Sequence, residues 1–509
     1  MFSKVASCSL HGLDARAVIV ETDLSNGLPG FQVVGLPDTS VRESKERIRA
    51  AIRNAGYKFP AKKITINLSP ADMRKGGTHF DLPIAVGIMI AAGELKENTS
   101  AKGFACLGEL SLNGRVQTVK GALPLVMGLR NSGFRSIILP AGNIEEASII
   151  DQMDLYPVNE LSEVFDIIET GSSRPFKSAG GSTAVTMVQT EDFSDVAGQE
   201  SVKRALQIAA AASHNILMTG PPGSGKTMMA KRLPGILPPM SYEEKLEVTK
   251  IYSIAGELSE KMPIVGTRQF RAPHHSISRA ALVGGGHDPK PGEISLAHFG
   301  VLFFDELPEF DRRVLEALRQ PMEDECVSIS RSSGTVRYPS KFLFVAGMNP
   351  CPCGFYGDPA RECTCSMSQI RNYMAKVSGP LLDRIDVHIE VFPPIFSELD
   401  GRNEHKSTSA MRKEIESAYE IQRDRYKNEA ISFNSQLPAG LAAKYCRMDN
   451  ETKKLLEEAF NRLALSARAY AKIVRVARTI ADMDMSEEIR AWHVAEAITY
   501  RSLDKRLKS

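Results

Sequence analysis

Two hydrophobic patterns alternate along the first part of the chain. Short runs rich in β-branched residues, typical of strands, lie at residues 17–21, 64–68 and 136–139. Between them, the apolar positions of residues 41–55 recur with the period of a helix, and a longer apolar run at 82–92 fits a buried helix. Alternating strands and helices predict an α/β domain over residues 1–170.

The pattern changes after residue 170. Residues 171–190 are rich in Ser, Gly, Ala and Pro without apolar periodicity, which predicts a linker. Residues 191–395 return to an α/β pattern and contain continuous apolar runs typical of central parallel strands, at 215–219, 300–304 and 342–347. Residues 396–509 are rich in Ala, Glu, Lys and Arg with a helical period, so we expect a small helical domain there.

A glycine-rich segment follows the first of these central strands. It fits the pattern G-x-x-x-x-G-K-[ST] and consists of Gly220, Pro221, Pro222, Gly223, Ser224, Gly225, Lys226 and Thr227. The strand before it and the helical residues after it are the context that a phosphate-binding loop (P-loop) requires. Glycines let backbone N–H groups surround phosphate oxygens at the start of a helix. We therefore expect Lys226 to reach the β- and γ-phosphates of ATP, and the Thr227 hydroxyl to bind Mg²⁺.

Two adjacent carboxylates end the next apolar strand. Asp305 and Glu306 follow residues 300–304, and the carboxyl ends of parallel strands meet at one edge of a sheet. Asp305 is expected to help hold Mg²⁺, and Glu306 to polarise the attacking water. The alternative is an exposed acidic loop that caps a predicted helix over residues 311–320.

Three further polar residues are candidates for the same chemistry. Asn349 ends the third apolar strand, where it can orient the attacking water or simply cap the following turn. Arg384 and Arg468 lie far along the chain from the P-loop, so they would stabilise transition-state charge only after subunit assembly or domain closure. From their spacing alone, both also fit ordinary surface arginines.

Four of the eight cysteines lie within fifteen residues. They form two C-x-C pairs, Cys351 with Cys353 and Cys363 with Cys365, and offer four thiolates for a tetrahedral Zn²⁺. Free cysteines or a redox pair are the alternatives. The remaining cysteines are scattered, as is typical of core residues: Cys8, Cys106, Cys326 and Cys446.

The composition limits the partners and the compartment. Hydrophobic residues are 43% and charged residues 24%, which is ordinary for a globular protein. With a net charge of +2, nucleic acid can be held only by local basic surfaces. The sequence shows neither a signal-peptide pattern nor an apolar stretch of about 18 residues, so we expect a cytoplasmic protein with no membrane partner.

Several long motifs extend from residue 271 to residue 483. They are RAPHHSISRAALVGGG, PKPGEISLAHFGVLFFDELPEF, MNPCPCG, LLDRID and SARAYAKIVRVARTIADM. Together they resemble the magnesium-chelatase-like branch of AAA+ ATPases, and within it the ComM/YifB group, over essentially the whole chain. The resemblance implies an AAA+ ATPase core over residues 191–395 and a helical lid over 396–509. It also implies that Arg384 is a finger supplied to a neighbouring subunit and that Arg468 is the sensor arginine of the lid.

The segment LGELSLNGRVQTVKGALPLVMGLRNSGFRSIILPAGN resembles the Lon-protease domain. This resemblance implies a Lon-like α/β domain over residues 1–170. A Lon protease needs a serine in a turn where this chain has Thr78 and His79, and a lysine near the position of Leu123. Without nucleophile and base, peptide hydrolysis is not expected.

Two inserts carry residues that suit DNA binding. Residues 326–339 alternate in polarity and turn at Ser333 and Gly334, as a β-hairpin does, and they carry Arg331 and Arg337. A second, glycine-rich loop supplies His274, His275, Arg279 and Lys290. Basic hairpins that line a ring can hold phosphates without reading sequence. Loops that pack subunits together are the alternative.

These features predict a ring-forming, hexameric ATPase that uses ATP and Mg²⁺. The ComM/YifB resemblance implies a DNA helicase or branch-migration motor that acts on recombination intermediates in natural transformation. The rival is a protein-remodelling or magnesium-chelatase-type ATPase subunit. A Lon-type protease is a third candidate, which the missing Ser-Lys pair argues against. Stimulation of ATP hydrolysis by DNA would separate the first candidate from the second.

Overall fold

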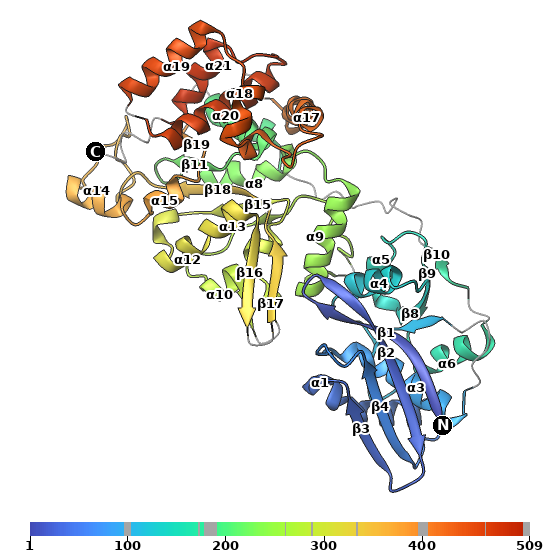
Figure 1. Cartoon of the computed structure of the whole chain (residues 1–509). Coiled ribbons are helices and arrows are strands. Elements are labelled where there is room, and N and C mark those ends of the chain that lie inside the picture. The colour runs from blue at the N-terminus through green and yellow to red at the C-terminus, as the bar shows by residue number, and fades with distance from the viewer. Residues whose placement is uncertain are drawn as a thin grey trace. The chain divides into compact units, whose positions relative to one another are not determined.

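The computed structural model describes residues 1–95, 103–171, 174–177, 191–259, 261–286, 289–331, 334–394, 406–463 and 465–501. The chain forms two compact units (Figure 1). The front unit comprises Met1–Thr186, Ser241–Gly266 and Ser332–Tyr338, and the P-loop unit comprises Met187–Met240, Thr267–Arg331 and Pro339–Ser509. The predicted linker at 171–190 lies largely outside the described residues, and the predicted domain boundaries stay predictions.

A mixed sheet of eight strands forms the centre of the front unit, in the order β10-β9-β8-β5-β1-β2-β4-β3. Its long strands β1, β2 and β4 are antiparallel neighbours, whereas β1, β5, β8 and β9 run parallel. The predicted strand runs fall within β2, β4 and β8. The bounds are β1 (Phe2–His11), β2 (Asp14–Ser25), β3 (Gly30–Val34), β4 (Lys63–Ser69), β5 (Phe104–Cys106), β8 (Ser136–Pro140), β9 (Asp154–Val158) and β10 (Phe176–Lys177).

Helices cover both faces of this sheet, because successive side chains of a strand point to opposite sides. Val5 of β1 joins the core under one set of helices, and its neighbour Ala6 joins the core under another. The first set is α2 (Ser44–Asn54), α3 (Asp81–Ala92) and α6 (Leu161–Thr170). The second set is α4 (Ala122–Asn131) and α5 (Ile144–Ala147). The predicted apolar helix is α3, and nearly all of its residues are buried.

The helix α9 (Tyr242–Ala255) follows the P-loop segment in sequence but belongs to the front unit. Its Tyr242 hydroxyl donates to the carbonyl of Ile149 at 2.7 Å. Its Ser253 hydroxyl donates to the buried carboxylate of Glu146, which also accepts from the backbone N–H of Leu123 at 2.9 Å. Burial raises the pKa of Glu146, and these two donors oppose that rise. Tertiary contacts therefore assign α9 to the front unit.

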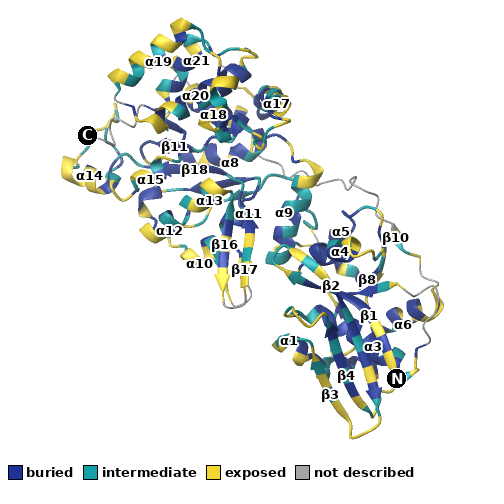
Figure 2. Ribbon diagram, in the orientation of Figure 1, coloured by how far each residue is buried: buried dark blue, intermediate teal, exposed yellow. Residues whose placement is uncertain are grey.

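The P-loop unit contains a sheet of five parallel strands, in the order β12-β15-β18-β11-β19. Its three central strands are buried throughout (Figure 2), as continuous apolar runs predict. Because β18 lies between β11 and β15, the carboxyl ends of all three strands are adjacent. The bounds are β11 (Ile216–Thr219), β12 (Phe270–Arg271), β15 (Val301–Phe304), β18 (Leu343–Met348) and β19 (Val387–Glu390).

The predicted helix over residues 311–320 is wrong in its length. The structure has α12 (Arg312–Ala317) and then α13 (Arg319–Asp324). Pro321 explains the break, because it has no backbone N–H to donate to Ala317 and its ring crowds that carbonyl. The predicted hairpin is present as the two-stranded sheet of β16 (Cys326–Arg331) and β17 (Gly334–Pro339), while Ser333 of its turn lies outside the described residues.

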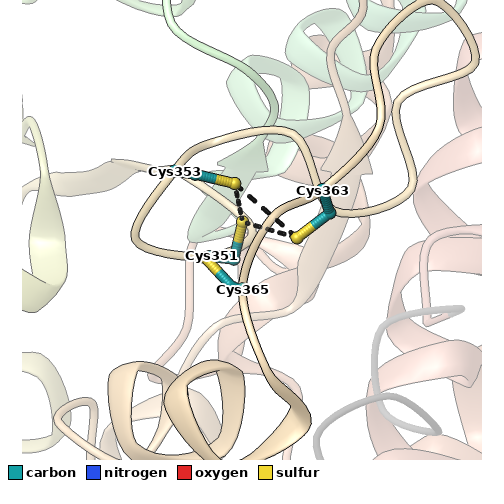
Figure 3. A group of neighbouring side chains, drawn as sticks. All are labelled: Cys351, Cys353, Cys363 and Cys365. Atoms are coloured by element: carbon teal, nitrogen blue, oxygen red, sulfur yellow. Dashed lines mark hydrogen bonds between the residues drawn. The ribbon is translucent and has the colours of Figure 1, made fainter.

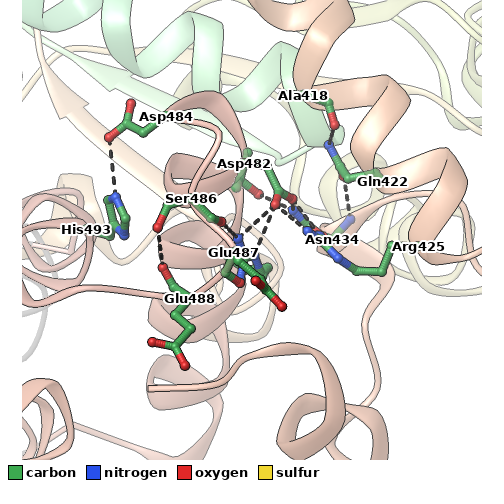
Figure 4. A network of polar contacts seen from close by, with 12 residues as sticks. Ala418, Gln422, Arg425, Asn434, Asp482, Asp484, Ser486, Glu487, Glu488 and His493 are labelled. Carbon is green, nitrogen blue, oxygen red and sulfur yellow. Dashed lines mark hydrogen bonds and ion pairs between the residues drawn. The ribbon is translucent and has the colours of Figure 1, made fainter. Parts of the chain in front are cut away.

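Helices form the last part of the P-loop unit, as the sequence predicts. They are α17 (Thr408–Arg425), α18 (Ala439–Tyr445), α19 (Asn450–Arg462), α20 (Ala467–Met483) and α21 (Ala491–Thr499). A polar network around the fully buried Asp482 of α20 ties that helix to α17 (Figure 4). Its carboxylate accepts from Arg425 at 2.6 Å, from Asn434 at 2.8 Å and from Arg478 at 3.1 Å. Of the helices described, none has the length and apolarity that a bilayer span requires.

Candidate nucleotide site

The P-loop connects β11 to α8 (Lys226–Ile236). Gly220 approaches a neighbouring strand end so closely that a Cβ atom would lie 2.0 Å from the carbonyl oxygen of Val391. Gly225 has φ +93°, a conformation that other residues rarely adopt. The loop therefore needs glycine at both positions, and its backbone leads directly into the N-terminus of α8.

Lys226 is buried at the centre of this loop. Its Nζ donates to the carbonyl oxygens of Gly220 at 2.8 Å and Pro221 at 3.0 Å. It also lies 3.4 Å from the Ser224 hydroxyl and 3.3 Å from Oδ1 of Asn349. Burial lowers the pKa of Lys226, and the nearby carboxylates of Asp305 and Glu306 oppose that fall.

The acidic pair lies beside the P-loop. The Thr227 hydroxyl donates to Oδ2 of Asp305 at 2.5 Å, although the two residues are far apart in sequence. Glu306 is exposed and has φ +53°, an uncommon conformation for a residue other than glycine. The N-cap of α12 is Asp311, so the acidic pair does not cap that helix. The side chain of Asn349, in turn, meets Lys226 from the end of β18.

A cavity of about 550 Å³ opens beside Glu306 and Asn349. The far wall comes from α14 (Met367–Met374) and the residues after it, which the sequence analysis did not single out. Tyr373 is its buried member and faces the same cavity as Asn349. In the sequence, the one sign of this wall was the position of α14 directly after Cys365, the last of the four clustered cysteines. The cavity is lined by Glu306, Glu309, Asn349, Pro352, Gln369, Asn372, Tyr373 and Lys376.

The structure brings Arg384 and Arg468 together, but not at the P-loop. Both line a cavity of about 660 Å³ whose walls include Asn215 and Gly300, the residues just before β11 and β15. This is the amino edge of the parallel sheet, opposite the P-loop. Arg384 pairs with Glu323 and donates to the carbonyl of Pro380 at 2.5 Å. Arg468, which is mostly exposed, lies 3.3 Å from Asp383.

The four clustered cysteines point toward a common centre (Figure 3). The Sγ atom of Cys351 lies 3.3 Å from that of Cys353 and 3.6 Å from that of Cys363. All four Sγ atoms, including that of Cys365, lie within 4.8 Å of one another. Four sulfurs bound to Zn²⁺ at about 2.3 Å in a tetrahedron would be about 3.8 Å apart, so this donor set fits zinc. Of the other cysteines, Cys8, Cys106 and Cys446 are buried as predicted, but Cys326 is only half-buried.

The front unit holds other side chains at the positions of the Lon catalytic pair. The Thr78 hydroxyl donates to the carboxylate of Glu109. His79 is buried with Nε2 2.7 Å from the carbonyl oxygen of Cys8, and burial lowers its pKa to about 4. Leu123 is fully buried at the start of α4.

The two basic inserts carry exposed polar side chains. The imidazole rings of His274 and His275 are tilted by 36° with their centroids 4.0 Å apart, and Arg279 begins the short helix α10 (Arg279–Val283). Gly285 of the same loop lies close to the guanidinium of Arg331 on β16, since a Cβ atom would stand 3.1 Å from it. The glycine loop and the turn end of β16 therefore lie side by side.

Three family descriptions match successive parts of the chain. "Magnesium chelatase, subunit ChlI" matches residues 192–398, which include the P-loop, the acidic pair and the cysteines. "Subunit ChlI of Mg-chelatase" matches residues 20–143 of the front unit, and "Magnesium chelatase, subunit ChlI C-terminal" matches residues 405–501.

Relatives match over nearly the full length. The uncharacterized protein YifB of Salmonella typhimurium is 42% identical over 503 residues, which cover 97% of this chain and 96% of YifB. The competence protein ComM of Haemophilus influenzae is 42% identical over 511 residues, which cover 99% of this chain and 98% of ComM. Lon protease 2 of Bacillus subtilis is 28% identical over 151 residues, 28% of this chain and 26% of the protease. The chain therefore belongs to the ComM/YifB group of magnesium-chelatase-like AAA+ proteins.

Proposed function

We propose that this protein is an ATP hydrolase whose site lies at the carboxyl edge of the five-stranded sheet. One observation carries the proposal: at three adjacent strand ends, the adjacent residues Lys226 and Thr227 contact Asn349 and Asp305, respectively. The P-loop backbone would hold the phosphates, and Lys226 would exchange its backbone partners for phosphate oxygens. The Thr227 hydroxyl and the Asp305 carboxylate would hold Mg²⁺, which neutralises phosphate charge when it is bound.

Glu306 is the proposed base for the attacking water. It lines the same cavity as Asn349, the residue proposed to orient the same water, and its unusual backbone conformation is of a kind often found at functional sites. Glu306 follows β15 and Asn349 follows its neighbour β18, which also pairs with the strand before the P-loop.

We further propose that subunits complete one another's sites in a ring, which the family resemblance suggests is hexameric. Arg384 and Arg468 lie at the amino edge of the sheet, so within one subunit the sheet separates them from the P-loop. In a head-to-tail ring, the amino edge of one subunit can face the carboxyl edge of the next. Each arginine would then stabilise transition-state charge in the neighbour's site.

DNA is the proposed substrate of this ring, with a helicase or branch-migration activity in the cytoplasm during natural transformation. The support is the pair of adjacent basic inserts and the similarity to a relative named as a competence protein. Contacts from arginine and lysine to phosphate give affinity without sequence preference. The magnesium-chelatase-type ATPase subunit remains the second candidate, because the matching family descriptions carry that name.

The Glu306→Gln variant tests this proposal. We expect it to bind ATP but to lose about 10²- to 10⁴-fold in kcat, because the amide cannot accept a proton from water. ATP-dependent unwinding of forked and four-way DNA should disappear with it. The matched control is Glu309→Gln, which removes another carboxylate from the same cavity and leaves the proposed base, Glu306, in place.

DNA dependence separates the two candidates. If single-stranded or branched DNA raises the wild-type rate of ATP hydrolysis, the DNA motor is supported. A rate that is indifferent to every DNA structure tried would contradict it and favour a chelatase-type subunit. Loss of hydrolysis in Lys226→Ala is expected under both and tests the site alone.

We propose that the front unit is not a protease. The support is the pair of side chains at the catalytic positions, since Thr78 is engaged by Glu109 and Leu123 cannot act as a base. We also propose that the four clustered cysteines bind one structural Zn²⁺, because their spacing suits tetrahedral thiolate coordination.

A further inference from the structure

The cysteine loop packs directly on the P-loop. The first cysteine follows Asn349 by two residues, and Asn349 contacts Lys226. Gly354 lies against Pro222 so closely that a Cβ atom would stand 2.5 Å from the proline ring. A change in the shape of this loop would therefore move residues of the nucleotide site.

The cysteine loop lacks the apolar burial that could fix its shape. Between Cys353 and Cys363 the backbone forms turns and bends, and residues 359–362 are all exposed. A segment with so few buried side chains usually needs a staple such as a structural metal. The four converging Sγ atoms supply the ligands for one.

Helix α14 links the cysteine loop back to Asn349. Its N-cap is Ser366, the residue directly after Cys365, which forms a capping box with Gln369. Two turns later, the buried Tyr373 lines the same cavity as Asn349. The segment that begins at Asn349 therefore passes through the cysteine loop and α14 and returns at Tyr373 to the cavity beside Asn349.

We propose that zinc held by Cys351, Cys353, Cys363 and Cys365 fixes α14, and that Tyr373 thereby positions Asn349 for ATP hydrolysis. Tyr373 is a positioning residue, because it is buried in the wall of the cavity that Asn349 also lines. The inference rests on the ATPase activity proposed above. In this proposal the metal affects the rate of ATP hydrolysis, whereas the P-loop determines the affinity for the nucleotide.

Two variants, compared with two controls, test this inference. Cys363→Ser with Cys365→Ser removes two ligands, and Tyr373→Phe removes only the phenol oxygen. The controls are Cys326→Ser, a half-buried cysteine outside the cluster, and Tyr57→Phe, which deletes a phenol oxygen in the front unit. Bound zinc, the Kd for a fluorescent ATP analogue, kcat without DNA and amide exchange near Asn349 are measured on the full-length chain.

We expect one zinc per chain in the wild type and in Tyr373→Phe, and none in the double cysteine variant. Both test variants should lose about 10-fold or more in kcat, with the Kd for the ATP analogue changed by less than about 3-fold. Amide exchange of the peptide that holds Asn349 should be faster in both. The two controls should match the wild type in every measurement.

Several results would overturn the inference. They are a wild type that binds no metal, a zinc-free variant that keeps the wild-type kcat, and wild-type exchange near Asn349 in Tyr373→Phe. If the wild type itself hydrolyses no ATP, the proposed function fails. Zinc content and amide exchange then still decide whether metal and tyrosine hold Asn349 in place.

Discussion

Arg384→Ala is expected to lower kcat for ATP hydrolysis by about 10³- to 10⁵-fold, the usual contribution of an arginine that stabilises a phosphoryl transition state. ATP binding should persist, because the P-loop and its contacts lie at the opposite edge of the sheet. The measurement is a steady-state rate beside the Kd for an ATP analogue. The matched control is Arg475→Ala, an arginine of the same cavity.

Mixing subunits shows whether Arg384 acts on a neighbour. A ring assembled from Arg384→Ala and Glu306→Gln subunits contains some interfaces where an intact Glu306 faces an intact Arg384. Hydrolysis should therefore reappear on mixing two nearly inactive proteins. If Arg384 served its own subunit, no interface could be whole, and the mixture would stay inactive.

Asp482→Ala is expected to destabilise the helical part of the P-loop unit by about 3–5 kcal/mol, the usual result of removing one member of a buried ion pair. Asp482 is fully buried and accepts from the guanidinium group of Arg425 (Figure 4) and from that of Arg478. Arg478 is fully buried as well, so it would keep its charge without its carboxylate partner. The measurement is the thermal or denaturant midpoint of the unfolding transition that includes the helices.

A neighbouring carboxylate provides the control. Asp484, on the same part of the chain, pairs with Arg204 at 3.4 Å, but its side chain is 39% exposed. Exposed ion pairs contribute about 0–1 kcal/mol, so Asp484→Ala should shift the midpoint little. Equal shifts for the two variants would show that burial of the pair is not what stabilises the network.

The central sheet could be predicted because its strands are buried on both faces. Each central strand is therefore a continuous apolar run, and each run ends in a polar residue that the parallel arrangement brings to one edge. This reasoning predicted that Lys226, Asp305 and Asn349 lie at adjacent strand ends. In the structure, Lys226 contacts Asn349, and Asp305 accepts a hydrogen bond from Thr227. Their catalytic roles stay predictions.

Other features depend on contacts that no local pattern reveals. The position of Tyr373 beside Asn349 requires the fold of the cysteine loop, and the meeting of Arg384 with Arg468 requires the packing of the helices on the sheet. Pro321 was a local signal for the break between α12 and α13, but the prediction of one helix followed the spacing of the apolar residues instead. Cys326 is half-buried because it opens an edge hairpin and not a core strand.

The assignment of α9 to the front unit bears on how the protein can be divided. A fragment that ends near residue 190 would lack Ser253 and Leu246, and with them a donor to the buried Glu146 and part of the cover over α4. Such a fragment should be poorly soluble, since it would expose an apolar helix face. The front unit and the P-loop unit are thus interleaved along the sequence. A single crossover between the genes of two relatives could not exchange the whole front unit.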